Sequence, residues 1–131
     1  MNIKTPKIFT LQEVKSALPY VKSVVSDLVS FHQQLLGMSN RKTDNYLHIK
    51  RQMELCRNEL RSVGCHIKNE KGGLVAFYWK GKSGIAELYW QLGEEDIYYW
   101  KEIGKKNLNL LPNAIKKIEL NLHNLKTPSI K

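Results

Sequence analysis

The sequence predicts an α+β fold, in which a long antiparallel helical hairpin packs on a small antiparallel β-sheet and C-terminal helices follow. Three observations lead to this prediction. Two segments before Gly64 carry apolar residues at alternating spacings of three and four, which is typical of packed helices. Between Gly64 and Gly93 the chain becomes rich in β-branched and aromatic residues interrupted by glycine turns. After Pro112 the three-four spacing returns.

With 131 residues the chain is long enough for one domain, and a second core is not expected. We expect this domain over residues 1–126. The helical hairpin takes about 10–64, a β-hairpin about 66–92 and a C-terminal helical part about 94–126. Residues 127–131 are expected to form a flexible tail.

The first helix begins after Thr10. The segment Thr10-Leu11-Gln12-Glu13 is a capping box, in which the threonine hydroxyl and the glutamate side chain satisfy backbone amides reciprocally. Pro19 disfavours helical geometry at Leu18 and lacks a backbone donor, so we expect this helix to stop or kink there. Proline suits a first helical turn, so Pro19 is also expected to begin a second, longer helix.

The helical hairpin is predicted by two apolar seams of matched length. A polar turn at residues 39–45 separates them, and Gly64 ends the second. Such seams also join separate chains, so a homodimer through these helices is an alternative use of the same residues. The seams are Val21, Val24, Leu28, Phe31, Leu35 and Met38, then Tyr46, Ile49, Met53, Cys56, Leu60 and Val63.

The β-region is predicted from a change of period. A short strand at 66–68 precedes a β-rich run at 74–79, and a loop at 81–84 leads to the partner strand at 85–91. Ala86, Leu88 and Trp90 alternate with more polar residues in that last strand. One face of the sheet is therefore expected to be apolar and to lie on the helical hairpin.

The segment after Gly93 is predicted to be helical. Glu94, Glu95 and Asp96 would fill its first turn, where the helix dipole favours negative charge. Ile97 and Trp100 would then face the core. Residues 107–111 are expected to form a loop or strand, and Pro112 to open a last amphipathic helix with an apolar stripe of Ile115, Ile118, Leu122 and Leu125.

Charge, hydropathy and cysteine content indicate which partners and which cellular compartment to expect. The formal net charge of +9 indicates nucleic acid or another polyanion as an alternative partner. No secretory signal and no run long enough to span a bilayer is visible, so we expect a cytoplasmic protein with no membrane contact. Cys56 and Cys65 are expected to be reduced and structural.

The sequence shows no catalytic or metal-binding motif. The four histidines do not have the spacing of a helical metal site, and no nucleophile elbow or phosphate-binding glycine loop occurs. We therefore expect no catalytic residues, no metal and no cofactor. The histidines, interpreted as ordinary surface residues, are His32, His48, His66 and His123.

The candidate recognition surface is the corner between residues 90 and 102, where aromatic and acidic side chains gather. Its alternative interpretation is a structural joint. A second candidate is a lysine-rich nucleic-acid surface formed by Lys105, Lys106, Lys116 and Lys117, and aromatic rings on the sheet beside lysines would suit single-stranded bases. The corner residues are Trp90, Gly93, Glu94, Trp100, Lys101 and Glu102.

From about residue 8 to Pro112 the chain resembles the bacterial domain-of-unknown-function family numbered 2203, as a divergent member. The most specific match is Trp90-Gln91-Leu92-Gly93-Glu94, followed by Ile97, Trp100 and Glu102. Further matches are Phe9-Thr10-Leu11, Leu18-Pro19, Leu60, Gly64 and Gly73-Leu74-Val75.

The resemblance implies the fold more than a function. Where the family usually has an aspartate, a histidine and another aspartate, this chain has Ala76, Lys101 and Gly104. A metal-binding or enzymatic activity of the family would thus be lost or altered here. We expect a binding or interaction module that is not an enzyme and has a protein partner of unknown identity.

Overall fold

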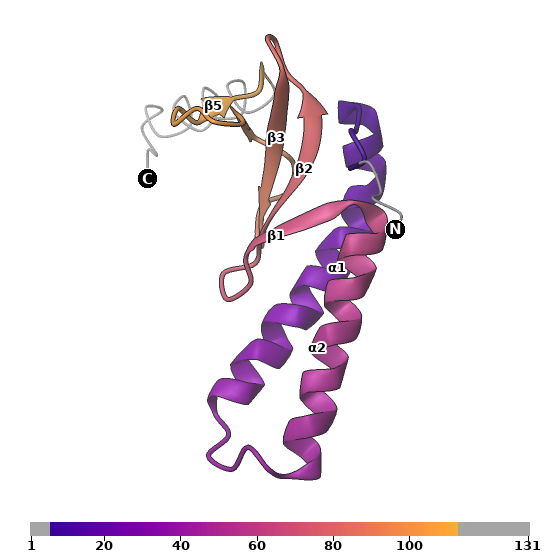
Figure 1. Cartoon of the computed structure of the whole chain (residues 1–131), viewed down its shortest axis with the longest axis vertical. Coiled ribbons are helices and arrows are strands. Elements are labelled where there is room, and N and C mark those ends of the chain that lie inside the picture. The colour runs from indigo at the N-terminus through magenta and orange to yellow at the C-terminus, as the bar shows by residue number, and fades with distance from the viewer. Residues whose placement is uncertain (1–5, 113–131) are drawn as a thin grey trace, which may run out of the picture.

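The computed structural model describes residues 6–112, which form two helices followed by a five-stranded sheet (Figure 1). Helices α1 (Leu11–Leu36) and α2 (Asp44–Val63) lie side by side and antiparallel. The strands are all antiparallel and follow one another across the sheet in chain order. The predicted α+β fold is confirmed. The strands are β1 (Cys65–Asn69), β2 (Leu74–Lys80), β3 (Ile85–Gln91), β4 (Tyr99–Glu102) and β5 (Asn109–Leu110).

Helix α1 begins with the predicted capping box. The Thr10 hydroxyl accepts from the Glu13 amide at 3.1 Å, and the Thr10 amide donates to the Glu13 carboxylate at 2.8 Å. The predicted stop at Pro19 is wrong, because α1 continues through this residue to Leu36. Pro19 is exposed, whereas its neighbour Leu18 is buried. The carbonyl that loses its helical donor can therefore bond to water, and the packing face is kept.

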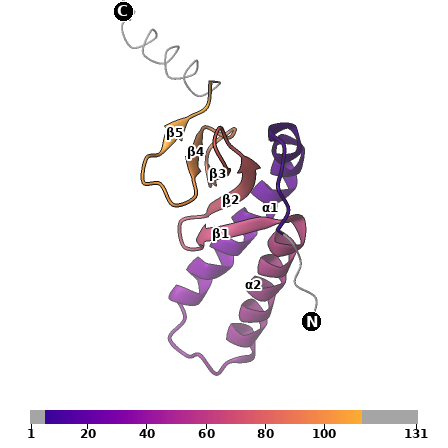
Figure 2. The same cartoon turned by 45° about the horizontal axis from the view of Figure 1, so that its top comes forward.

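The two seams meet inside the chain. Leu28 of α1 and Leu60 of α2 are among the largest fully buried side chains, and both belong to one continuous core. Thr43 caps the start of α2 by accepting from the Tyr46 amide at 3.1 Å, and Gly64 ends it with a φ of 102°. The long hairpin extends well beyond the sheet, which covers only one of its ends (Figures 1 and 2).

The sheet packs on the helices through alternate residues. Val75 and Phe77 of β2 and Leu88 and Trp90 of β3 are at most 1% exposed and share the core with α1 and α2. Gly73 permits a close approach to α1: its φ is 73°, and an added Cβ would lie 3.2 Å from Val25. The expectation of one apolar sheet face on the hairpin is confirmed.

The predicted helix at residue 94 is wrong. Residues 94–98 form an irregular connection, and Tyr99–Glu102 is the fourth strand. Ile97 is fully buried as expected, but it reaches the core from this connection. The Lys22 ammonium group donates to the Glu95 carbonyl at 2.6 Å, and Lys15 lies 3.7 Å from the Asp96 carboxylate. These contacts fasten the acidic run to α1.

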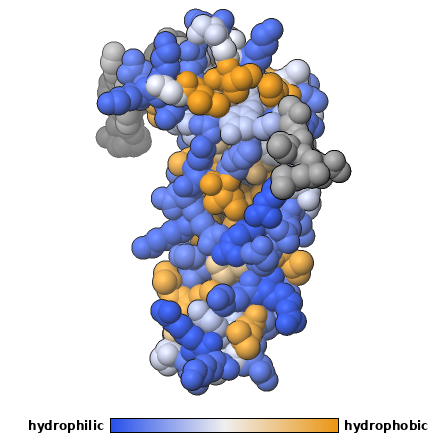
Figure 3. Space-filling model, viewed as in Figure 1, coloured by the Kyte–Doolittle hydropathy of each residue, from blue (hydrophilic) through white to orange (hydrophobic). Residues whose placement is uncertain are grey.

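The predicted helix after Pro112 and the tail at 127–131 lie outside the described residues. Within residues 6–112, no helix is both long enough and apolar enough to cross a membrane. Residues 109–110 form strand β5, within the segment for which a loop or strand was expected. On the face shown in Figure 3, apolar residues reach the surface in separate groups among hydrophilic ones.

Candidate functional site

The sheet has an outer face, formed by the side chains of β1 to β4 that point away from α1. Strand register orders them in rows. Leu74 pairs with Gln91 across β2 and β3, and two residues further along β3 Tyr89 pairs with Tyr99 of β4. Glu87 pairs with Lys101, two residues further again. Because alternate residues share a face, these three rows lie on one surface.

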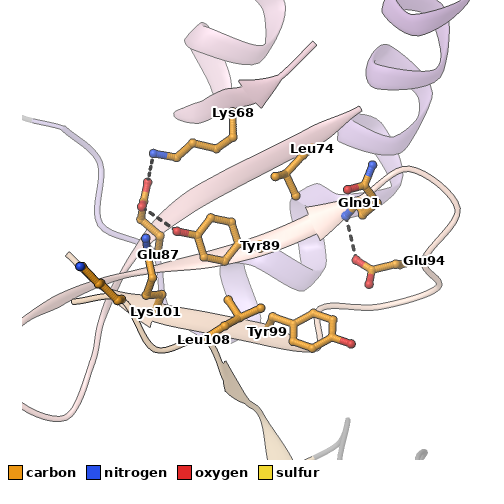
Figure 4. Close-up of a pocket in the computed structure, with 10 residues that line it drawn as sticks. Lys68, Leu74, Glu87, Tyr89, Gln91, Glu94, Tyr99, Lys101 and Leu108 are labelled. Atoms are coloured by element: carbon orange, nitrogen blue, oxygen red, sulfur yellow. Dashed lines mark hydrogen bonds and ion pairs between the residues drawn. The ribbon is translucent and has the colours of Figure 1, made fainter. Parts of the chain in front are cut away.

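A pocket of about 650 Å³ occupies this outer face. Its floor comes from the strands, and the segment between β4 and β5 supplies one wall. This volume is in the range of cavities that hold small organic ligands. The lining side chains, most of them labelled in Figure 4, are Lys68, Leu74, Glu87, Tyr89, Gln91, Glu94, Tyr99, Lys101, Lys106 and Leu108.

Glu87 organises one end of the outer-face pocket. It is 6% exposed, and its carboxylate accepts from the Lys68 ammonium group at 2.6 Å and from the Tyr89 hydroxyl at 2.9 Å (Figure 4). Burial, aided by the hydrogen bond to Glu87, raises the pKa of Tyr89 to about 12. Tyr89 therefore remains protonated at neutral pH, and its side chain is held as a hydrogen-bond donor.

His66 lies on the same face of β1 as Lys68. Its ring packs on Tyr78 with the centroids 4.3 Å apart, and its Nε2 atom is buried without a hydrogen-bond partner among residues 6–112. Burial and, to a lesser extent, the nearby Lys68 lower the pKa of His66. The interpretation of His66 as an ordinary surface histidine thus misses its packing.

Lys101 and Lys106 provide positive charge that the pocket itself does not neutralise. Neither ammonium group has an ion-pair or hydrogen-bond partner within residues 6–112, whereas Lys68 is paired with Glu87. Lysine ammonium groups carry three donors each. The charged end of the pocket is therefore equipped to bind an anion.

Half of the predicted recognition corner is structural. Trp90 is 1% exposed, and its indole N–H donates to the Glu94 carbonyl at 2.8 Å. The Glu94 carboxylate accepts from the Gln91 amide at 2.8 Å, and Gly93 between them has a φ of 104°. These contacts form the joint that the alternative interpretation described. The Glu94 side chain also reaches the rim of the outer-face pocket.

The remaining corner residues divide between the two sheet faces. Lys101 points to the outer face, while Trp100 packs edge-to-face on Trp79 with centroids 5.6 Å apart. Glu102 accepts from the Ser83 hydroxyl at 2.8 Å at the β2–β3 loop. Glu94 and Lys101 are the two predicted corner residues that line the pocket, toward its two ends.

The predicted nucleic-acid surface is described only in part. Lys106 lines the pocket and Lys105 is exposed beside it, while Lys116 and Lys117 lie outside the described residues. Among residues 6–112, no group of three or more histidine, cysteine, aspartate or glutamate side chains is arranged to hold a metal ion.

Sequence reasoning missed Lys68, Glu87, Tyr89 and Tyr99 as site residues. The alternation of β3 was recognised, and it places Glu87 and Tyr89 on the face opposite the core. Tyr99 was missed because residues 99–102 were predicted to be helical. Only as a strand are Tyr99 and Lys101 in register with β3. Ala76 and Lys101, two of the departures from the family pattern, also lie on this outer face.

One comparison with known proteins gives a match. The family described as "Uncharacterized conserved protein (DUF2203)" matches residues 7–106, which is most of the chain. The chain therefore belongs to this family. No curated protein and no solved structure matches it.

Proposed function

We propose that this member of the DUF2203 family is a binding protein whose outer sheet face takes a small organic anion. The observation that supports it is the 650 Å³ pocket, whose lining contains Lys68, Lys101 and Lys106 beside the buried carboxylate of Glu87 and the partly exposed one of Glu94. The Glu87 carboxylate is already engaged by Lys68 and Tyr89. The other two lysines are therefore available to a ligand.

The rest of the pocket favours an organic ligand over a bare inorganic ion. Leu74, Tyr99 and Leu108 line it together with the charged groups, and Leu108 is 56% exposed. Covering such apolar surface stabilises a complex by about 25 cal/mol per Å² before the costs of association. An anion with an apolar body would contact both parts of the pocket.

A thermal-stability screen with organic and inorganic anions tests this proposal. A ligand at about 100 times its Kd stabilises the folded state by about 2.7 kcal/mol, which raises Tm by several degrees. Lys101→Gln should weaken binding by about 10- to 100-fold, because a charge-assisted hydrogen bond contributes roughly 1.5–3 kcal/mol.

Lys42→Gln is the matched control. It removes the same charge at the turn between α1 and α2, far from the sheet (Figure 1). If both variants lose the same affinity for the anion, the loss reflects the net charge of the protein and not a contact with Lys101. Absence of any stabilising anion would contradict the proposal.

Nucleic-acid binding through the C-terminal lysines is a second candidate, because Lys105 and Lys106 are exposed and the net charge is +9. Binding of this kind weakens steeply as salt rises, since it depends on counterion release. Changing Lys105, Lys106, Lys116 and Lys117 to glutamine should then reduce it for all sequences alike. A cytoplasmic location, a protein partner and a homodimer through α1 and α2 also stay predictions.

A further inference from the structure

The outer-face pocket has two chemically different ends, and strand geometry sets the distance between them. The row of Glu87 and Lys101 lies four residues along β3 from the row of Leu74 and Gln91. At about 3.4 Å per residue, the rows are about 14 Å apart. A ligand that contacts both ends is therefore elongated and carries a different group at each end.

The charged end matches a phosphate monoester. The pocket lining holds Lys68, Lys101 and Lys106 against the carboxylates of Glu87 and Glu94, and Lys68 is already paired with Glu87. A phosphate monoester carries about −1.5 to −2 charges at pH 7. It also presents several acceptor oxygens to the two lysines that have no partner within residues 6–112.

The middle of the pocket suits a flat ring. Tyr99 and Leu108 lie on the same side of the pocket in Figure 4, and Leu74 lies across from them. Tyr99 is half-buried, so part of its ring remains available for contact. Every nucleobase has a flat face that stacks on an aromatic side chain of this kind.

The far end offers acceptors to a hydrogen-bond donor. Glu94 uses its Oε1 atom for the Gln91 amide, and Oε2 has no hydrogen-bond partner within residues 6–112. The Gln91 side-chain amide donates to the Gly72 carbonyl, which leaves its own oxygen as an acceptor. Amino groups of nucleobases are donors of this kind.

We infer that the anion of the proposed function is a nucleotide: the phosphate at Lys101 and Lys106, the base beside Tyr99, and a base amino group at Glu94. This inference rests on the proposed function and specifies its ligand. It favours cytosine and adenine over uracil, because uracil presents a carbonyl where cytosine presents an amino group.

Isothermal titration with matched ligands tests the inference. CMP should bind about tenfold more tightly than UMP, as one hydrogen bond to a charged acceptor contributes about 1.5 kcal/mol. Cytidine and inorganic phosphate, each lacking one half of the ligand, should both bind more weakly than CMP. Glu94→Gln should remove most of the preference for CMP over UMP.

Three variants separate the contribution of the base from that of the phosphate. Tyr99→Leu should weaken CMP by about tenfold and leave inorganic phosphate unchanged, whereas Lys101→Gln should weaken both. Lys42→Gln should weaken neither. A parallel titration with oligocytidylate shows whether the bound nucleotide is free or part of a single strand. If the oligonucleotide binds and CMP does not, and Tyr99→Leu and Lys101→Gln weaken the oligonucleotide as described for CMP, the nucleotide unit belongs to a single strand.

The outcomes separate this inference from the proposed function. If phosphate or tripolyphosphate competes as well as CMP and Tyr99→Leu changes nothing, the nucleotide is excluded while the anion site stands. If UMP and CMP bind equally in the wild type, the amino contact at Glu94 is excluded and the inference fails as stated, while the anion site stands. If no anion binds, both fail.

Discussion

Glu87 is the residue on which the outer face depends most. It is the one charged side chain among residues 6–112 that is buried, and its oxygens are shared between Lys68 and the Tyr89 hydroxyl. Lys68 comes from β1 and Tyr89 from β3, so Glu87 links two strands that are separated by β2. The floor of the pocket is thereby held in one arrangement.

Replacing Glu87 with alanine should lower the free energy of unfolding by about 1–3 kcal/mol. The Tyr89 hydroxyl would lose its acceptor in a half-buried position, and leaving such a group unsatisfied costs about that much. Chemical denaturation measures the change. Glu59→Ala is the control, since Glu59 also accepts from a tyrosine, Tyr20, but is exposed. Its effect should stay within about 0.5 kcal/mol, and equal effects would contradict the role given to Glu87.

At the scale of elements, α1 shows how an exposed proline is tolerated in a helix. Val14, Leu18 and Val21 stay buried on either side of Pro19, so packing holds the helix together across the missing hydrogen bond. The propensity rule that predicts a stop there is a local one, and tertiary burial outweighs it.

Pro19→Ala should therefore raise the free energy of unfolding, by about 1–3 kcal/mol. Alanine restores the backbone donor and removes the clash of the ring with the preceding turn. The exposed position means that no packing is lost. Thermal denaturation would show a higher Tm, and a lower Tm would mean that α1 uses the proline geometry.

A second element-scale contact joins α2 to the turn between β1 and β2. Arg57 donates twice to the Glu70 carboxylate, with its Nε atom 2.6 Å from Oε1 and its Nη2 atom 3.1 Å from Oε2. His32 of α1 lies 3.5 Å from the same carboxylate. The Arg57 guanidinium is the main cause of a lowered pKa for Glu70.

This lowered pKa predicts a pH dependence of stability. The unfolded chain binds the proton more tightly, so the stabilisation is present above the ordinary value of 4.5 and is lost as pH falls below it. Glu70→Gln should reduce stability by about 1 kcal/mol at neutral pH, and the gap from the wild type should close below about pH 4.5. Glu54→Gln, which alters an exposed partner of the same arginine, should give a smaller gap. Urea denaturation at several pH values measures both, and a gap independent of pH would refute the assignment.

Residues 94–102, which were predicted to be helical, form the connection and the strand β4 that complete the pocket. Glu94, Glu95 and Asp96 have the composition of a helix start, and the dipole argument favours that interpretation. In the structure their charges are met by other partners, such as Lys15 for Asp96 and the Gln91 amide for Glu94. These partners are distant in sequence or depend on the Gly93 turn, so a local pattern does not reveal them.

For the molecule as a whole, the seams and the apolar sheet face were sufficient to predict the fold. Seam residues such as Leu28 and Leu60, 32 positions apart, have the same periodicity and become one core with Leu88 and Trp90. The pocket was less predictable, because its lining comes from four strands, from Glu94 in the connection between β3 and β4, and from the segment after β4. Its members are adjacent only through strand register, which the sequence does not specify across β3 and β4.

Substitutions in the core of the helical hairpin should lower the free energy of unfolding more than substitutions at its surface. Leu28→Ala and Leu60→Ala should each lower the free energy of unfolding by about 2–5 kcal/mol, because both side chains are at most 2% exposed. Leu47→Ala, at a position that is 52% exposed, should cost less than about 0.5 kcal/mol. Denaturant titration compares the three, and equal small effects would contradict the core assignment.

The most direct test of the anion-binding outer face is a ¹⁵N–¹H NMR titration with CMP and with an anion found in the thermal screen. Binding at the outer face should give saturable shifts confined to the amides of β1 to β4 and of residues 104–108, with those of Lys101 and Tyr99 among the largest. Amides around Lys42 at the far end of the hairpin should not move. Shifts that follow the exposed lysines of the whole molecule, without saturation, would contradict binding at this face.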